Sequence, residues 1–131
     1  MNEPVDELSA AIRVHVVPEY REEESSSSEQ RFVFSYTITV HNHSAHNVQL
    51  LARYWKITQG SGKVQEVRGK GVVGKQPLIG PGQTFRYTSR AVLECPVGVM
   101  EGAYTCVDTR SQQAFEVRIP PFRLAGPNQV H

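Results

Sequence analysis

A strict alternation of apolar and polar side chains in segment 32–40 constrains the fold of this chain more than any other feature. The large apolar residues of the segment occupy one parity: Phe32, Phe34, Tyr36, Ile38 and Val40. Successive side chains of a β-strand point to opposite faces of a sheet, so this period of two indicates a strand buried on one side. Further strands are predicted at 12–16, 50–58, 64–67, 84–94, 103–108, 115–119 and 122–125.

Short clusters of glycine, proline, serine and asparagine separate these segments. Residues 59–62 read Gln-Gly-Ser-Gly between two predicted strands, a pattern typical of a β-hairpin. A helical period of 3.6 is present only weakly, at 6–12. Many short strands joined by turns favour an all-β fold, an antiparallel β-sandwich, with a closed barrel as the alternative.

The core of this sandwich is predicted from the large aromatic residues. In segment 50–58, we expect Leu51 and Trp55 on one face, and Leu50 and Tyr54 on the other. Aromatic residues predicted for the core are Phe34, Tyr36, Tyr54, Trp55, Phe85 and Tyr87.

Length and charge limit what the protein can be. With 131 residues we expect one domain, 1–131, with an ordered core at about 12–125 and flexible tails at 1–10 and 126–131. Segment 21–30 is acidic and serine-rich, which predicts a mobile, solvated loop. A net charge of +1 argues against nucleic acid as a partner. The chain lacks both an apolar run of about 20 residues and an apolar leader, so we expect no membrane association and a cytoplasmic location.

The sequence Arg68-Gly69-Lys70-Gly71-Val72-Val73-Gly74-Lys75-Gln76-Pro77 contains a Gly-x-Gly-x-x-Gly motif. In dinucleotide-binding folds, a helix follows these glycines and its N-terminus holds the pyrophosphate. Here Pro77, Gly80, Pro81 and Gly82 follow instead, and they exclude a helix. The motif therefore belongs to a loop of a different fold.

Three interpretations of this loop remain open. The glycines can simply supply the backbone conformations that a turn or bulge needs. Backbone amides from Gly69 to Gly74 can form an anion-binding nest, with Arg68, Lys70 and Lys75 adding charge, for pyrophosphate or a dinucleoside polyphosphate. Alternatively, the loop docks a protein partner through exposed Val72 and Val73.

Other candidate sites are weaker. His41, His43 and His46 have a spacing that metal ligands can use, but no carboxylate or thiolate lies close in sequence, so we predict neither a metal site nor a cofactor. Cys95 and Cys106 are expected to be reduced thiols without a catalytic role. No catalytic motif is present, and we predict that the protein is not an enzyme.

Several phrases, taken in order, resemble the ApaG (CorD) family of small bacterial proteins. The resemblance covers about residues 12–124, and its phrases are Phe-Val-Phe-Ser-Tyr-Thr-Ile-Thr-Val at 32–40, Leu-Ala-Arg-Tyr-Trp at 51–55, the stretch 64–77, Ile-Gly-Pro-Gly at 79–82, Phe-Arg-Tyr-Thr-Ser at 85–89, Val-Gly-Val-Met-Glu-Gly at 97–102 and Ile-Pro-Pro-Phe at 119–122. Lys70 and Lys75 stand where the family commonly has acidic residues, and Cys95 stands where threonine is common.

The resemblance implies a fibronectin-III/immunoglobulin-like sandwich and a role in protein–protein interaction, because related domains occur in eukaryotic F-box proteins and a polymerase-delta-interacting protein. It also implies an association with cobalt resistance and magnesium efflux, and with a neighbouring gene for a diadenosine-tetraphosphate hydrolase.

We therefore predict a non-catalytic binding module. Its working surface is segment 68–77, joined by Met100, Glu101, Gly102 and Arg53 if the fold brings them near. A homodimer through free sheet edges is compatible with this fold.

Overall fold

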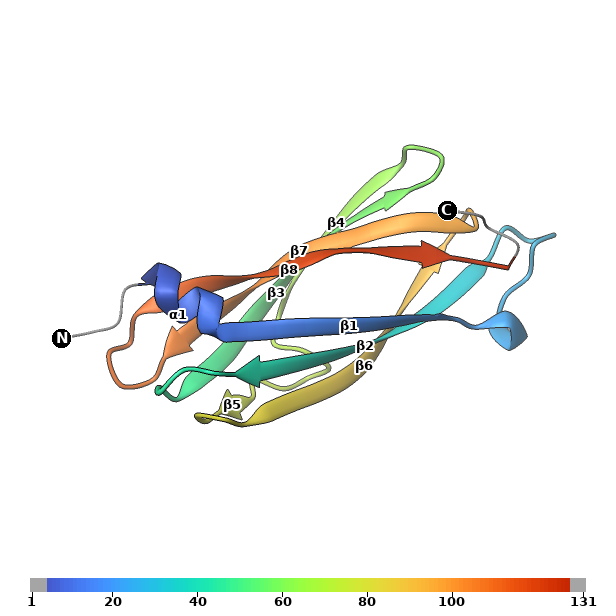
Figure 1. Cartoon of the computed structure of the whole chain (residues 1–131). Coiled ribbons are helices and arrows are strands. Elements are labelled where there is room, and N and C mark those ends of the chain that lie inside the picture. The colour runs from blue at the N-terminus through green and yellow to red at the C-terminus, as the bar shows by residue number, and fades with distance from the viewer. Residues whose placement is uncertain (1–4, 128–131) are drawn as a thin grey trace.

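The computed structural model describes residues 5–127 as two antiparallel β-sheets packed face to face (Figure 1). The chain begins with helix α1 (Val5–Ala11), and a short 3₁₀ helix, η1 (Glu22–Glu24), follows the first strand. The strands are β1 (Ile12–Tyr20), β2 (Phe32–Asn42), β3 (Val48–Gln59), β4 (Val64–Lys70), β5 (Leu78–Ile79), β6 (Thr84–Leu93), β7 (Val97–Asp108) and β8 (Ala114–Ala125).

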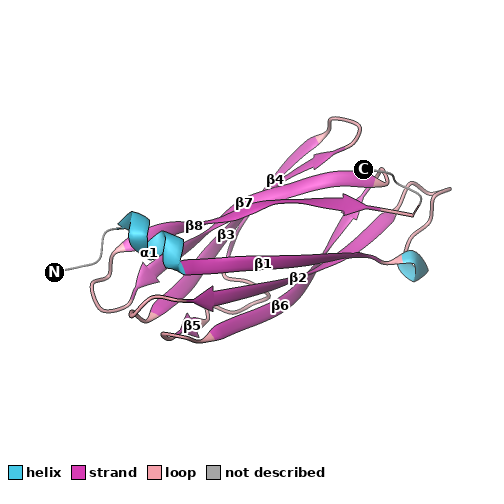
Figure 2. Cartoon of the chain, in the orientation of Figure 1, coloured by secondary structure: helices cyan, strands magenta, loops and turns pink. Residues whose placement is uncertain are grey.

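One sheet has the strand order β1-β2-β6, and the other has the order β4-β3-β7-β8, with β5 paired to β3 (Figure 2). This architecture confirms the predicted all-β, fibronectin-III/immunoglobulin-like antiparallel sandwich. The hairpin predicted at 59–62 is present, because the Gly62 amide donates to the Gln59 carbonyl at 2.8 Å. Segments 115–119 and 122–125 form one strand, β8, with a bulge between them. Within residues 5–127, no helix is long and apolar enough to cross a membrane.

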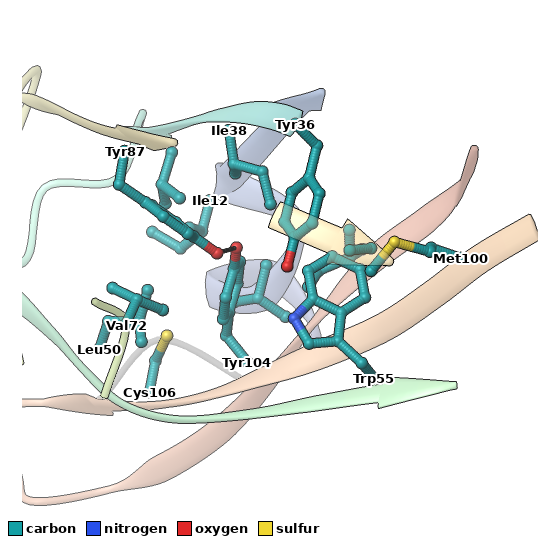
Figure 3. Packing of buried hydrophobic residues seen from close by; sticks show 14 of the residues in the cluster. Ile12, Tyr36, Ile38, Leu50, Trp55, Val72, Tyr87, Met100, Tyr104 and Cys106 are labelled. Carbon is teal, nitrogen blue, oxygen red and sulfur yellow. Dashed lines mark hydrogen bonds between the residues drawn. The ribbon is translucent and has the colours of Figure 1, made fainter. Parts of the chain in front are cut away.

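The core lies between the sheets and is rich in aromatic side chains (Figure 3). Tyr36 of β2 packs edge-on against Trp55 of β3, with ring centroids 5.5 Å apart. Tyr87 of β6 and Tyr104 of β7 meet through their hydroxyl groups across the two sheets. The aromatic core was predicted correctly for Phe34, Tyr36, Trp55 and Tyr87, and Phe85 packs against it half-buried.

A β-bulge in β3 changes which side chains face the core. Leu50 is opposite Cys106 of β7, but the next paired residue is Ala52, so Leu51 is the extra residue. An extra residue moves every later side chain to the opposite face. Leu50 and Trp55 are consequently both buried, and Tyr54 lies on the outer face. The sequence prediction placed Leu50 and Trp55 on different faces of the strand, and Tyr54 in the core. Both placements were wrong for this reason.

The two lateral sides of the sandwich differ. On one side β1 and β8 are in contact, and α1 packs on β8. Leu8 of α1 is only 1% exposed, and the Ser9 hydroxyl donates to the Glu116 carbonyl. Of the predicted flexible tail 1–10, residues 5–10 belong to helix α1, while residues 1–4 and 128–131 lie outside the described part of the chain. On the opposite side, β5 pairs with β3 of one sheet, and its Ile79 carbonyl accepts a hydrogen bond of 2.9 Å from the Asn42 side chain of β2 in the other.

The acidic, serine-rich segment is more regular than its composition indicates. It contains η1, followed by a turn in which Ser26 and Arg31 exchange two backbone hydrogen bonds of 2.8 and 2.9 Å. Glu24 of this segment forms an ion pair with Arg90 of β6. Instead of an irregular loop, the segment is an exposed but hydrogen-bonded connection.

Candidate functional site: the glycine turn and the cavity beneath it

The Gly-x-Gly-x-x-Gly motif spans the end of β4 and a tight turn, which we call the glycine turn (71–77). Val72 and Lys75 exchange two backbone hydrogen bonds, of 2.8 and 2.9 Å. The two residues between them, Val73 and Gly74, both have positive φ, at 43° and 78°. This is the backbone of a tight hairpin turn with two left-handed residues. No helix follows, in agreement with the sequence prediction.

Most amides of the motif already have acceptors. The Gly71 amide donates to the Leu51 carbonyl at 2.7 Å, and the Val72 and Lys75 amides donate within the turn. An anion nest needs several successive amides that point at one ligand. The predicted run of converging amides from Gly69 to Gly74 is therefore not formed, and only its outer part, at Val73 and Gly74, remains for such a role.

Gly71 is required by the close approach of its own turn. Its φ is +66°, and a Cβ atom at this position would lie 2.3 Å from the Lys75 carbonyl oxygen. A contact this short involves backbone, so neither partner can move away without opening the turn. This observation supports the first interpretation of the motif, in which glycine supplies a conformation rather than a ligand contact.

The two valines of the turn have opposite environments. Val72 is fully buried, at 0% exposure, and belongs to the core cluster. Val73 is 51% exposed. The prediction that both valines are exposed docking residues is therefore wrong for Val72, which anchors the turn in the core. A β-branched residue is strongly disfavoured at positive φ, so Val73 occupies a strained position.

Arg53 of β3 supports the turn from below. Arg53 has the same parity as Trp55, and the bulge at Leu51 turns this parity to the inner face of the sheet. Its Nη1 donates to the Gly71 carbonyl at 2.9 Å and to the Lys70 carbonyl at 3.2 Å. Arg53 is also paired with Gly69 of β4, and a Cβ atom on Gly69 would lie 2.7 Å from the Arg53 Cζ. Gly69 therefore leaves the space in which the guanidinium lies.

A cavity of about 270 Å³ opens beneath the turn, between the two sheets. We call it the inter-sheet cavity. The turn residues 72–74 line it on one side. Its polar side chains come from three other strands and are those of Tyr36, Arg53, Tyr87 and Ser89, beside the indole of Trp55. Lys70 also lines it, but this residue is paired with Ala52 and has the parity of outward-facing Arg68, and its carbonyl accepts from Arg53. The sequence prediction included Lys70 in the site, and Arg53 only if the fold brought it near. It gave no sign that hydroxyls of β2 and β6 complete it.

The tyrosine hydroxyls of this cavity stay protonated. Burial raises the pKa of Tyr36, with the Ser89 hydroxyl and the Arg53 guanidinium acting in the opposite direction. Burial also raises the pKa of Tyr87 far above its ordinary value, although a hydrogen bond from Tyr104 and the charge of Arg53 oppose the shift. The pKa of Tyr104 is raised in the same direction, chiefly by burial. Each phenol is therefore a neutral group that can donate one hydrogen bond.

A second hollow, of about 740 Å³, lies on the outer face of the five-stranded sheet. Its floor includes Gly69 and Gly102, and Glu101 lies at its side. Arg68 stacks over the Tyr54 ring at 4.4 Å, and the Tyr54 hydroxyl donates to Glu66 at 2.6 Å. The fold thus brings Glu101 and Gly102 near the glycine motif, which was the condition set for including them in the working surface. Met100 is 1% exposed and belongs to the core instead.

The histidines do not converge. His41 Nδ1 and His43 Nε2 are 2.5 Å apart, whereas His46 Nδ1 lies 2.9 Å from the Asp108 carboxylate. Among the described residues, no three histidine, cysteine or acidic side chains form a group that could hold a metal ion. The pKa of Asp108 is lowered even though burial acts to raise it, because the Arg110 amide and His46 favour the carboxylate.

The two cysteines are separate thiols, with Cys95 just before the start of β7 and Cys106 near its end. Burial raises the pKa of Cys106 to about 12, so this thiol is not a thiolate near neutral pH. Cys95 Sγ contacts the Gln59 Oε1 at 3.4 Å and the Val97 carbonyl at 3.3 Å.

The fold and the glycine turn, which is held by Val72 and Arg53, place this chain in a class of small two-sheet β-sandwich domains. Residues 22–108 match the model of the ApaG domain. The chain is 74% identical over 127 residues to Protein ApaG of Chromohalobacter salexigens, covering 97% of this chain and all of the relative. It is 57% identical over 112 residues to Protein ApaG of Pectobacterium atrosepticum, covering 86% and 89%. The chain belongs to the ApaG family.

Solved structures agree with this assignment. A crystal structure of an ApaA protein from Bordetella pertussis superposes with a TM-score of 0.86 at 47% identity, covering 90% of this chain and 95% of that one. A Bacteroides uniformis β-glucuronidase also matches, with a TM-score of 0.55 at 13% identity, over 85% of this chain but only 13% of the enzyme. At that identity the likeness concerns the fold alone.

Proposed function

We propose that the protein is a non-catalytic binding module that docks a protein partner through the glycine turn. The observation that carries this proposal is Val73. It is half exposed at the tip of a turn that Val72 and Arg53 hold from inside, and it occupies a backbone conformation that suits glycine far better than valine. A strained, exposed apolar residue on a rigid support is typical of a contact site.

The rest of the turn fits this role. Lys70 and Lys75 flank Val73 and supply charge at the rim of the contact, where it would speed association. Because the turn is ordered before it binds, little conformational entropy is lost on docking. The family association with cobalt resistance and magnesium efflux would then act through the partner, in the cytoplasm.

A pyrophosphate-containing nucleotide is the second candidate ligand for the turn. Lys70, Gly71, Gly74 and Lys75 line a shallow hollow of about 360 Å³ on its outer side. This ligand predicts binding that weakens with salt and with Lys70→Glu or Lys75→Glu. A homodimer remains a prediction that concerns β4 and β6, each of which pairs with one strand only within residues 5–127.

The partner surface can be tested with a photo-crosslinking amino acid placed at Val73, in cells that express the protein. Val17 is the matched control, because it is 52% exposed and lies on β1, away from the glycine turn. We expect a discrete crosslinked protein at position 73 that is absent at position 17 and lost with Lys75→Glu. Equal crosslinking at both positions, or none at position 73, would contradict the proposal.

A further inference from the structure

Arg53 is a half-buried cation without an anionic partner. It donates Nη1 to two backbone carbonyls, but within residues 5–127 no carboxylate forms an ion pair with it. The charges that act on neighbouring Tyr36 and Tyr87 include Arg53 and no acidic side chain. Charges removed from water are normally paired, because leaving one unpaired costs several kcal/mol. The inter-sheet cavity beside this guanidinium is the place where a counter-charge fits.

The other groups around the cavity are also donors. The hydroxyls of Tyr36, Tyr87 and Ser89 can each donate a hydrogen bond. Tyr87 contacts the fully buried hydroxyl of Tyr104, so when Tyr104 donates to Tyr87 the Tyr87 proton is left for another acceptor. A lining with one cation, three hydroxyls and no carboxylate side chain favours a ligand that only accepts hydrogen bonds.

The size of the cavity limits that ligand. About 270 Å³ is below the usual range for drug-sized molecules and suits a single small group with a few waters. A dinucleotide cannot enter it. A phosphate or a carboxylate can, and Arg53 presents the planar donor geometry that such oxyanions match.

We propose that the inter-sheet cavity binds one small oxyanion group, a phosphate or a carboxylate, between Arg53 on one side and the hydroxyls of Tyr36, Tyr87 and Ser89 on the other. These donors lie outside the glycine turn, and the existence of the site does not depend on a protein partner. The oxyanion would pair Arg53 and fasten β4 to the β2–β6 sheet from inside.

Gly69 offers a way to disturb the site without removing any donor. A methyl group at this position would meet the end of the Arg53 side chain, which is flexible, rather than backbone. Gly69 lies in extended backbone, so alanine is not strained there. Gly69→Ala should therefore displace the guanidinium from the cavity while leaving the fold intact.

The experiment is a titration of the whole chain with inorganic phosphate, acetate and pyrophosphate, each at constant ionic strength with chloride. Trp55 is the one tryptophan of the sequence and lines the cavity, so its fluorescence reports occupancy. Amide shifts recorded by NMR in the same titration locate the site. Preference for phosphate over acetate would assign a phosphate group, and the reverse a carboxylate. If pyrophosphate and phosphate bind with similar affinity, the cavity holds a single phosphate group.

We expect saturable binding that Arg53→Gln and Gly69→Ala weaken about tenfold or more, since each removes a charge-assisted contact. Tyr36→Phe and Ser89→Ala should each weaken it about 2- to 10-fold, as expected for a single hydrogen bond. Arg68→Gln is the matched control, because Arg68 stacks on Tyr54 on the outer face, and it should leave binding unchanged. Thermal melts check that each variant is folded.

Three results would overturn the proposal. They are no saturable response to any of the three anions at tens of millimolar, an equal loss with Arg68→Gln and Arg53→Gln, and binding that Tyr36→Phe, Ser89→Ala and Gly69→Ala all leave intact. The last result would place the anion on the outer amides of the glycine turn instead. Val73 also lines the cavity, but the donors of the proposed oxyanion site lie outside the glycine turn, so the proposed partner function can survive each of these outcomes.

Discussion

The glycine turn and the acidic segment 21–30, together with Arg31 that follows it, are both polar connections in the sequence, but the structure holds them in different ways. Each contains a pair of residues that exchange two backbone hydrogen bonds, Val72 with Lys75 and Ser26 with Arg31. The glycine turn also inserts Val72 into the core and is supported by Arg53. In the acidic segment, η1 has no buried residue, and the attachments are made by side chains at the surface.

This difference shows that the polarity of a connecting segment does not indicate how firmly the segment is attached to the sandwich. In the acidic segment, Ser25 is the main attachment, since its Oγ donates to the Arg21 carbonyl and accepts from the Val33 amide. Loss of the Ser25 hydroxyl should release only the acidic segment from the sandwich. The glycine turn, in contrast, shares a residue with the core, so damage there should lower the stability of the whole domain. The predictions below test this difference.

The largest effect is expected for Val72→Asp. It places a carboxylate in the core and should lower the free energy of unfolding by about 3 kcal/mol or more. Ser27→Asp in the acidic segment is the control, with an expected change within about 0.5 kcal/mol. Chemical denaturation measures both. Similar stabilities for the two variants would show that Val72 is not an anchor.

Gly71→Ala should come next, at about 2 to 3 kcal/mol, because it combines positive φ with a clash against the Lys75 carbonyl. Gly74 also has positive φ but open space around it, so Gly74→Ala should cost only about 1 kcal/mol. Thermal unfolding of the two variants separates the cost of the steric clash at Gly71 from the cost of a positive φ alone at Gly74. A larger loss with Gly74→Ala would contradict the close approach at Gly71.

Removing one arginine from each connection should separate them further. Arg53→Gln loses two hydrogen bonds to carbonyls of the glycine turn and should cost about 1 to 2 kcal/mol, largely independent of salt. Arg90→Gln breaks the surface ion pair with Glu24, which is worth at most about 1 kcal/mol and fades at high salt. Denaturation at low and high salt measures the difference, and a strong salt dependence for Arg53→Gln would argue against its support of the turn.

The smallest effect concerns two residues with positive φ, Val73 in the glycine turn and Gln30 in the acidic segment. Val73→Gly should raise stability by up to about 1 kcal/mol, because glycine relieves the strain of a β-branched residue there. Gln30→Gly should change it by about 0.5 kcal/mol or less, since the gain is offset by a more flexible unfolded chain. If Val73→Gly raises stability and also abolishes crosslinking of the partner from neighbouring positions, then valine at this residue lowers stability but is required for binding.

Much of the fold could be predicted from the sequence, because alternation is a local property. Segments 32–40 and 84–94 alternate strictly, and both are strands with the predicted inward faces. Helix α1 was missed because its seven residues carry too weak a period, although Leu8 buries fully against the sandwich. The 3₁₀ turn η1 was missed because its three residues are too few to leave a period in the sequence.

The candidate site was harder to predict than the fold. The glycine motif identified the turn, and its prolines correctly excluded a helix. The inter-sheet cavity depends on Tyr36, Tyr87 and Ser89, which are far from the motif in sequence and look like ordinary strand residues. Val72 and Val73 are identical neighbours with opposite burial, and only the backbone of the finished turn separates them.

The single extra residue in β3 has a consequence for how this domain can change. Strand β3 before Leu51 presents its even-numbered side chains to the core, and after Leu51 it presents the odd-numbered ones. If β3 ran through Leu51 with regular pairing and no bulge, two whole sets of side chains would change places: Tyr54 and Lys56 would turn inward, and Arg53 and Trp55 would turn out to solvent. Deleting Leu51, in contrast, would remove the bulge and leave each of these side chains on its present face. The cation of the cavity and the indole beside it thus depend on one irregularity of a strand as much as on their own identities.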